Sequence, residues 1–256
     1  MVVMIGQATR LAQFIDRDEK EYVATIRFGF ETDTGDKTGS PKSKVQSPKS
    51  ISIAEVDGIL PRFTGEIEQV PPMYSAKKID GKKLYESARK GIEVERKPHR
   101  VTIRELRVDQ ASLTCDLELA TCDMELTVVC TAGTYIRVLA EDIGRTIGVG
   151  AHLAELRRTR SGRFDLSQAI TLDGLAAMDD PASALLPMEM AVEHLPVFVL
   201  RNDRLAKTRN GMSTRIGDAA FADGETVRMT TSEGELVAIG SYSVEDGSVK
   251  PQVVLV

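Results

Sequence analysis

The chain has 256 residues, of which 28% are charged and 42% are hydrophobic, a balance typical of globular proteins. No apolar run approaches the roughly 20 residues that a membrane-spanning helix needs, and the N-terminus has no signal-peptide pattern. We therefore expect a cytoplasmic protein with no membrane contact. The formal net charge of -5 argues mildly against a nucleic-acid partner, because such partners usually meet a basic surface.

The sequence offers few candidate metal ligands. Cys115, Cys122 and Cys130 lack the C-x-x-C spacing of zinc sites, and we interpret them as small apolar core residues of a reduced protein. The acidic segment ETDTGDKTG lacks the ligand order of a calcium-binding loop. His152 has no partner at metal spacing, which favours a structural, hydrogen-bonded residue. The sequence predicts no metal site.

The net charge hides two local concentrations of basic residues. The first extends over residues 77–107. The second comprises Arg157, Arg158, Arg160 and Arg163. A charged run is usually a solvated face, but these two clusters flank Tyr135 in the sequence. Contact with phosphate groups therefore competes with the simpler interpretation.

The first half of the chain mixes helical and strand-like patterns. Apolar residues recur at helical spacing over residues 8–15, and EYVATIRFGF alternates with the period of a strand. Segment 40–50 is polar and broken by prolines, which predicts an exposed, mobile excursion. Ser52 and Glu55 form a capping box at the start of a helix, and a second short helix is predicted near residues 84–88. Strand-like runs follow at residues 100–108, 115–120 and 124–130.

The segment TAGTYIRVLAEDIG, residues 131–144, organises the rest of the chain. Its apolar positions recur at steps of three and four, which predicts a helix with one buried face. Thr134 stands where an N-cap residue belongs. Tyr135 and Arg137 would then leave the first helical turn beside free backbone N–H groups, an arrangement suited to planar, anionic groups.

The pattern changes again after residue 170. Residues 171–190 predict a helical link, and short strand-like runs with one helix near residues 203–210 follow from residue 195. We predict an α+β fold with a mixed, mainly antiparallel sheet and flanking helices, plus a small C-terminal β-rich module. The predicted domains are residues 1–190 and 191–256.

Several motifs together resemble the TruB family of bacterial tRNA pseudouridine synthases. They are, in order, KEY at residues 20–22, the TDTGD loop, GEIEQVPPMYSAKKIDGKKLYE, GTYIRVLAEDIG and GAHLAELRRTRSGRF. The resemblance extends over most of residues 5–170, and the C-terminal segment is similar to the RNA-binding PUA-type module of such enzymes. It implies isomerisation of uridine 55 in the T loop of tRNA, without a cofactor, by an enzyme that flips its target base out of the loop.

The resemblance also implies roles for individual residues. Tyr22 would pack on the flipped uracil, Tyr135 would line the base pocket and Leu156 would close it. Arg137 would pair with the catalytic aspartate and hold it ionised. Contacts to RNA are expected from Lys20, Lys77, Arg157 and Arg158. The simpler alternatives are core positions for Tyr22 and Leu156, and a surface ion pair of Arg137 with Glu141.

The family's nucleophilic aspartate lies in a G-x-L-D motif that the 256 residues do not contain. Asp33 and Asp36 match another family element and are not candidates for the nucleophile. We expect that the working protein has a longer N-terminus carrying this motif, and that it acts as a monomer without an obligate protein partner. A non-catalytic protein that binds or folds tRNA, and a fragment that folds poorly, stay as alternatives.

Overall fold

The computed structural model describes residues 1–15, 19–44, 51–79, 81–109, 112–116, 119–217 and 221–255. The chain divides into two compact units. We call Asp18–Leu166 the sheet unit, and Met1–Arg17 with Ser167–Val256 the C-terminal unit. The domain boundary between residues 190 and 191 stays a prediction. The helices found among the described residues are too short or too polar to span a bilayer.

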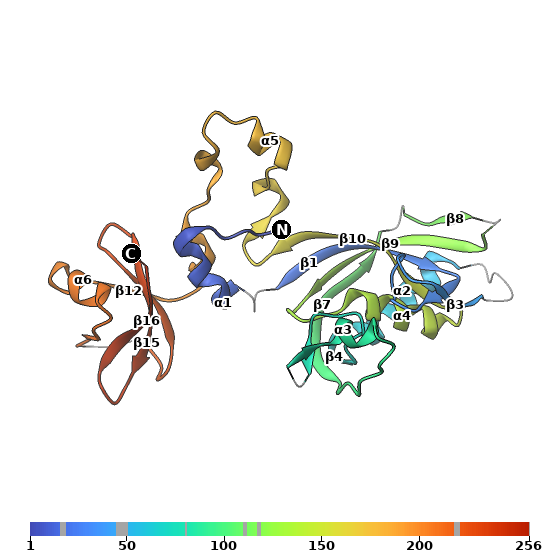
Figure 1. Cartoon of the computed structure of the whole chain (residues 1–256), viewed down its shortest axis with the longest axis horizontal. Coiled ribbons are helices and arrows are strands. Elements are labelled where there is room, and N and C mark those ends of the chain that lie inside the picture. Colours follow the sequence, from blue (N-terminus) through green and yellow to red (C-terminus); the bar gives the residue numbers. More distant parts are fainter. Residues whose placement is uncertain are drawn as a thin grey trace. The chain divides into compact units, whose positions relative to one another are not determined.

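The sheet unit is built on a seven-stranded antiparallel sheet, as the sequence predicted (Figure 1). Its strand order is β11-β10-β1-β9-β7-β4, and β8 pairs with β9. The strands are β1 (Lys20–Phe28), β4 (Gly65–Gln69), β7 (His99–Val108), β8 (Thr114–Asp116), β9 (Thr121–Cys130), β10 (Ala151–Ser161) and β11 (Phe164–Asp165).

The core of the sheet unit forms where two helices pack on the apolar side chains of the sheet. Helix α4 (Ile136–Ile147) contacts β10 and β1, and α2 (Ile53–Ile59) contacts α4 and β7 (Figure 1). Alternate residues Ala24, Ile26 and Phe28 of β1 are at most 1% exposed, as the period of a strand requires. The buried face of α4 follows the predicted helical spacing. This burial is the main source of the unit's stability.

Shorter elements complete the sheet unit. They are β2 (Phe30–Thr32), β3 (Pro41–Lys44), η2 (Leu60–Phe63), β5 (Lys78–Ile79), β6 (Lys82–Lys83) and α3 (Leu84–Ala88). Ser52 is the N-cap of α2, as predicted, since the Glu55 N–H donates to the Ser52 hydroxyl at 3.2 Å. Of the predicted excursion at residues 40–50, residues 45–50 lie outside the described residues.

Two local predictions are wrong. Thr134 is not the N-cap of α4: Tyr135 occupies that position, and the Thr134 hydroxyl donates to the Thr131 carbonyl at 2.8 Å. Cys115 and Cys122 are not reduced thiols, because pairing of β8 with β9 places them opposite each other in a disulfide, and Cys115 is exposed rather than in the core. Their Cα atoms are 4.1 Å apart because the two residues face each other in the paired strands. Cys130 is a free, buried thiol, as predicted.

The C-terminal unit has its own sheet and core. The five-stranded sheet has the order β12-β14-β15-β16-β13, with β12 and β14 parallel and its other pairs antiparallel. Its strands are β12 (Val197–Val199), β13 (Thr214–Arg215), β14 (Thr226–Thr230), β15 (Leu236–Ser243) and β16 (Ser248–Val254). The helices are η1 (Gly6–Leu11), α1 (Ala12–Ile15), α5 (Leu172–Ala176), η4 (Pro181–Ala184), η5 (Met188–Val192) and α6 (Asn202–Arg209), with η3 (Leu166–Gln168) at the boundary of the two units. The predicted β-rich module is confirmed.

We expect Gly144→Ala in α4 to destabilise the protein, although alanine is the better helix former by about 1 kcal/mol. A Cβ at residue 144 would lie 2.4 Å from the Cβ and backbone N of Ala151, so α4 and β10 would have to separate. The expected loss is about 1–3 kcal/mol in urea unfolding followed by circular dichroism.

The matched control is Gly58→Ala in α2, where a Cβ meets no atom within 4 Å. This variant should gain about 0.5–1 kcal/mol, because alanine loses less backbone freedom on folding. A stabilised Gly144→Ala protein would show that the helix can move off β10 without cost.

Candidate active site

A cavity of about 420 Å³ opens in the sheet unit where four segments meet. They are β1, the loop at residues 36–38, the start of α4, and the middle of β10. The cavity brings together four predicted site residues, which are Tyr22, Tyr135, Arg137 and Leu156. The lining residues are Tyr22, Asp36, Lys37, Thr38, Thr134, Tyr135, Ile136, Arg137, Leu153, Ala154, Glu155 and Leu156.

Sheet topology places Tyr22 and Leu156 at diagonal positions of two paired strands. Strand β1 lies between β9 and β10, with Tyr22 opposite Arg158 and Ala24 opposite Leu156. The ladder between β1 and β10 is irregular at Glu21/Tyr22, which redirects side chains locally. Leu156 is 46% exposed and is therefore not a core residue. Tyr22 packs partly against the core and also lines the cavity.

Arg137 joins three segments at one wall of the cavity. Its Nη1 lies 3.0 Å from Oδ2 of Asp36 and 3.4 Å from the Thr34 carbonyl oxygen. Its Nη2 donates to the Tyr74 carbonyl oxygen at 2.8 Å. The ion-pair partner is thus Asp36 rather than Glu141, whose carboxylate instead bonds Arg145 at 3.1 Å. A guanidinium held at several points keeps a fixed orientation.

Asp36 is held as firmly as its partner. Its Oδ1 accepts from the Thr38 hydroxyl at 2.5 Å, the Thr34 hydroxyl at 2.8 Å and the Thr38 N–H at 3.0 Å. Burial acts to raise the pKa of Asp36, but these hydrogen bonds and the Arg137 charge outweigh it, so the pKa lies below its ordinary value. The carboxylate is therefore ionised at neutral pH.

The loop that carries Asp36 is fixed against β10. The Leu153 N–H donates to the Gly35 carbonyl oxygen at 3.0 Å, and the Lys37 N–H donates to the Leu153 carbonyl oxygen at 3.1 Å. These bonds form a short parallel bridge between Asp36 and Leu153. Two walls of the cavity are thereby joined by main-chain hydrogen bonds.

The phenol of Tyr22 is neutral in this setting. Burial raises the pKa of Tyr22, and Cys130 acts in the same direction, while the charge and hydrogen bond of Arg158 partly oppose the rise. Tyr22 therefore presents an O–H group and a ring face rather than an anion.

His152 has the structural role that the sequence predicted. It is 2% exposed, and its Nδ1 lies 3.1 Å from the Phe30 carbonyl oxygen. Burial lowers the pKa of His152, which favours the neutral ring. Within the described ranges, no group of three or more His, Cys, Asp and Glu side chains is placed to hold a metal ion.

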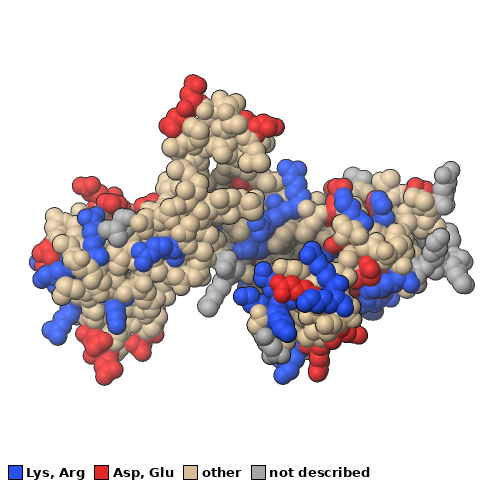
Figure 2. Space-filling view, viewed as in Figure 1, with Lys and Arg blue, Asp and Glu red and all other residues tan. Residues whose placement is uncertain are grey.

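The other predicted contact residues lie outside the cavity lining. Lys20 begins β1, and Lys77 is exposed just before β5. Arg157 and Arg158 are exposed on β10, next to Leu156. In the view of Figure 2, Lys and Arg side chains gather over β10 and over the region of α3 and β4, with acidic side chains among them. A basic surface thus exists locally despite the negative net charge.

Sequence reasoning gave no role to Asp36, Lys37 and Thr38, although all three line the cavity. The TDTGD loop is one of the family motifs, but the sequence pattern assigns its side chains no partner. A threonine-rich loop with a central aspartate indicates a carboxylate held by local hydrogen bonds. That signal identifies Asp36 as an anchored anion without indicating its partner.

Two solved structures share the fold. One is titled "Crystal Structure of a Cbf5-Nop10-Gar1 Complex"; its matching chain is 26% identical, with a TM-score of 0.67 over 98% of this chain and 71% of that chain. The other is titled "Structure of H/ACA RNP bound to a substrate RNA containing 2'-deoxyuridine", at 24% identity and a TM-score of 0.67 over 98% and 70% of the two chains.

Sequence comparison is more specific. Residues 1–136 match the TruB family pseudouridylate synthase N-terminal domain, and residues 137–193 match the tRNA pseudouridylate synthase B C-terminal domain. A tRNA pseudouridine synthase B of Bacillus pumilus is 39% identical over 99% of this chain and 83% of the relative. That of Bordetella avium is 46% identical over 78% of each chain. The chain therefore belongs to the TruB family of pseudouridylate synthases.

The lowered pKa of Asp36 predicts how the pair with Arg137 depends on pH. A carboxylate with a depressed pKa stabilises the fold above its unfolded pKa, about 3.9, and this contribution is lost as the pH falls through the folded pKa. We expect wild-type protein to melt at a higher temperature than Asp36→Asn above about pH 4, with the gap closing below that pH. Melting curves of both proteins from neutral to acidic pH measure this difference. A gap that stays constant into acid would contradict the assigned ion pair.

Proposed function

We propose that this chain acts as a tRNA pseudouridine synthase, an isomerase that converts uridine 55 of the T loop to pseudouridine. This proposal depends on the observation that four predicted site residues line the same cavity, namely Tyr22, Tyr135, Arg137 and Leu156. The family match and the names of the relatives support the reaction class. They lend no support to the alternative of a non-catalytic tRNA-binding protein.

The cavity is suited to a base turned out of an RNA loop. Its volume of about 420 Å³ lies within the range of small-ligand sites. Tyr22 and Tyr135 supply ring faces for stacking, and the half-exposed Leu156 supplies an apolar edge. Because Tyr22 stays protonated, its hydroxyl can donate a hydrogen bond to a base carbonyl. These contacts would offset the unstacking cost of a few kcal/mol.

Arg137 supplies fixed positive charge at the cavity wall. Asp36 neutralises part of that charge and holds the guanidinium in place. We assign Arg137 the further role of pairing with the nucleophilic aspartate of the family's G-x-L-D motif. No G-x-L-D occurs in the 256 residues, and the hydrogen bonds of Asp36 fit an anchor rather than a nucleophile.

Phosphate contacts are assigned to four basic side chains of the sheet unit. Arg157 and Arg158 follow Leu156 on β10 and are both exposed. Lys77 is exposed on the basic excursion, which we define as residues 70–98. Together with Lys20 at the start of β1, they would hold the RNA backbone while the base enters the cavity.

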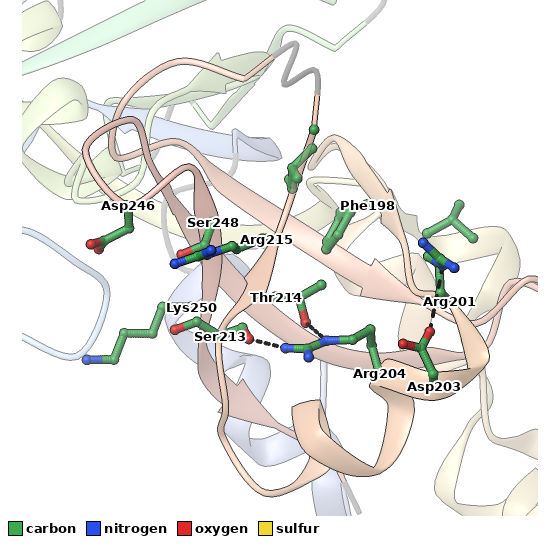
Figure 3. A pocket seen from close by; sticks show the side chains of 13 residues that line it. Phe198, Arg201, Asp203, Arg204, Ser213, Thr214, Arg215, Asp246, Ser248 and Lys250 are labelled. Carbon is green, nitrogen blue, oxygen red and sulfur yellow. Dashed lines mark hydrogen bonds and ion pairs between the residues drawn. The ribbon is translucent and has the colours of Figure 1, made fainter.

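The C-terminal unit has a cavity of about 770 Å³ beside β13, β16 and the start of α6 (Figure 3). Two of its cations are occupied: Arg204 donates to Ser213 and Thr214, and Arg201 lies 3.7 Å from Asp203. Arg215 and Lys250 are exposed and have no ion pair or side-chain hydrogen bond within the described residues. We propose that these two cations bind tRNA phosphates outside the T loop.

The proposed substrate determines the remaining assignments. Transfer RNA is found in the cytoplasm, so the enzyme would act there. The reaction rearranges one nucleotide without a redox step, and we assign it no cofactor or metal. We further propose that the chain is a monomer of 28.0 kDa and binds tRNA in that form. Light scattering on the free protein measures its mass.

We expect Tyr135→Ala to weaken binding to a T stem-loop RNA by roughly 1–3 kcal/mol, because the base loses a stacking partner. Tyr135→Phe keeps the ring and should bind nearly as well as wild type. Fluorescence anisotropy with labelled stem-loop RNA measures both. Equal affinities for all three proteins would remove Tyr135 from the base pocket.

We expect Arg215→Ala and Lys250→Ala each to weaken binding to whole tRNA and to lower the salt dependence of log K by about one. Neither change should alter binding to the isolated T stem-loop. Lys207→Ala in α6, outside the cavity lining, is the matched control. Equal losses on stem-loop and whole tRNA would contradict a separate phosphate site.

A further inference from the structure

The turn between β9 and α4 is held by a side chain from another strand. Tyr135 is the N-cap residue of α4, and its own side chain makes no capping hydrogen bond to the first turn of the helix. Its N–H donates to Oε1 of Gln69 at 2.9 Å, and Nε2 of Gln69 donates to the Tyr135 carbonyl oxygen at 3.3 Å. One amide thus bonds both main-chain groups of the residue whose ring lines the cavity.

Gln69 is itself fixed in place. It ends β4, lies opposite His99 of β7 in the ladder and is 1% exposed. A buried amide without partners is costly, so its hydrogen bonds to Tyr135 are strongly favoured over an open arrangement. The position of β4 therefore determines the position of the turn.

His99 adds a second connection to the same turn. Its Nδ1 lies 2.9 Å from the Gln69 carbonyl oxygen, and its Nε2 lies 3.1 Å from the Gly133 carbonyl oxygen. Both partners are acceptors, so each contact is a hydrogen bond when the facing nitrogen carries a proton. The imidazole also meets the Tyr135 ring edge-on, with centroids 5.8 Å apart and planes at 86°.

Gln69 and His99 stand at the two ends of the basic excursion. The excursion, residues 70–98, leaves β4 directly after Gln69 and enters β7 at His99. Within it, the Tyr74 carbonyl oxygen accepts from Arg137, two residues beyond Tyr135. The excursion is therefore connected to the first turn of α4 at its start, within its length and at its end.

We propose that Gln69 and His99 are positioning residues that hold Tyr135 in the orientation required by the base pocket, and that they couple the basic excursion to that pocket. This inference rests on the proposed function, because it takes the cavity to be the site of the flipped base. A contact of RNA with the excursion would then also act on the ring on which the base stacks.

Two variants remove the connections while keeping the shape of the side chains. Gln69→Met retains length and volume but cannot bond Tyr135. His99→Phe keeps a ring and loses both nitrogens, whereas His99→Asn restores an N–H near the position of Nδ1. Gln252→Met and His194→Asn, both at exposed positions of the C-terminal unit, are matched controls.

The first measurement needs no RNA. Amide hydrogen exchange of Tyr135, followed by NMR, should become roughly tenfold faster in Gln69→Met, because the acceptor of its N–H is lost. Exchange of the Ile143 amide, in the middle of α4, should not change. The controls should exchange as wild type.

The second measurement uses T stem-loop RNA with 2-aminopurine next to the target uridine, whose fluorescence rises when the neighbouring base unstacks. Gln69→Met and His99→Phe should bind about fivefold to tenfold more weakly, and the signal at saturation should fall. His99→Asn should recover part of both. A merely structural role would lower the melting temperature and leave the saturated signal unchanged.

The outcomes separate the two proposals. If wild-type protein fails to bind the stem-loop, the proposed function is wrong, whatever the exchange data show. If wild type binds and both loss variants match it in affinity and saturated signal, the positioning role is wrong. Faster exchange of the Tyr135 amide together with unchanged RNA binding also overturns the positioning role. In that case Gln69 would hold the turn, but holding it would not affect the bound base.

Discussion

The candidate site depends on the ion pair and hydrogen bonds made by the guanidinium of Arg137. It meets Asp36 at 3.0 Å and the Tyr74 carbonyl oxygen at 2.8 Å, so it joins helix α4, the TDTGD loop and the basic excursion. A planar cation with several fixed donors can bond such partners at the same time. Without it, α4 would lose these hydrogen bonds to the TDTGD loop and to Tyr74.

The sheet supplies the rigid frame for that interaction. Strand β1 has neighbours on both sides, and the core side chains of its buried face pack under α4. Gly144 permits α4 to approach β10 closely, which sets the distance between the residues on the two elements. Binding residues on such a packed frame are held more precisely than residues on loops alone.

Among the residues that the structure describes, some basic side chains of the sheet unit form ion pairs, and others have no acidic partner and could contact phosphate groups. Of the arginines on β10, Arg160 forms ion pairs with Glu19 at 3.1 Å and Glu21 at 3.5 Å. Its charge therefore has a structural role. Arg157 has no ion-pair partner within the described residues. One basic cluster in the sequence thus contains both structural and available side chains. Composition alone cannot separate them, because the acidic partners are distant in the sequence.

Much of the fold and part of the site were accessible from sequence. The period of β1, the capping box at Ser52 and the apolar face of α4 are local patterns, and each formed the predicted element. The helical pattern of residues 131–144 indicates Tyr135 and Arg137, and the family resemblance adds Tyr22 and Leu156. The structure places all four around one cavity. The roles assigned to them stay proposals.

The sequence by itself determined β1, α2, α4 and the family, because each depends on residues that are close together along the chain or on motifs of characteristic order. Only the tertiary structure decided that Tyr135, not Thr134, caps α4, that Gln69 holds it, and that Cys115 bonds Cys122. Each of these contacts requires the pairing of strands or the meeting of segments. Partners of that kind follow from the register and packing of the whole sheet, which local patterns do not specify.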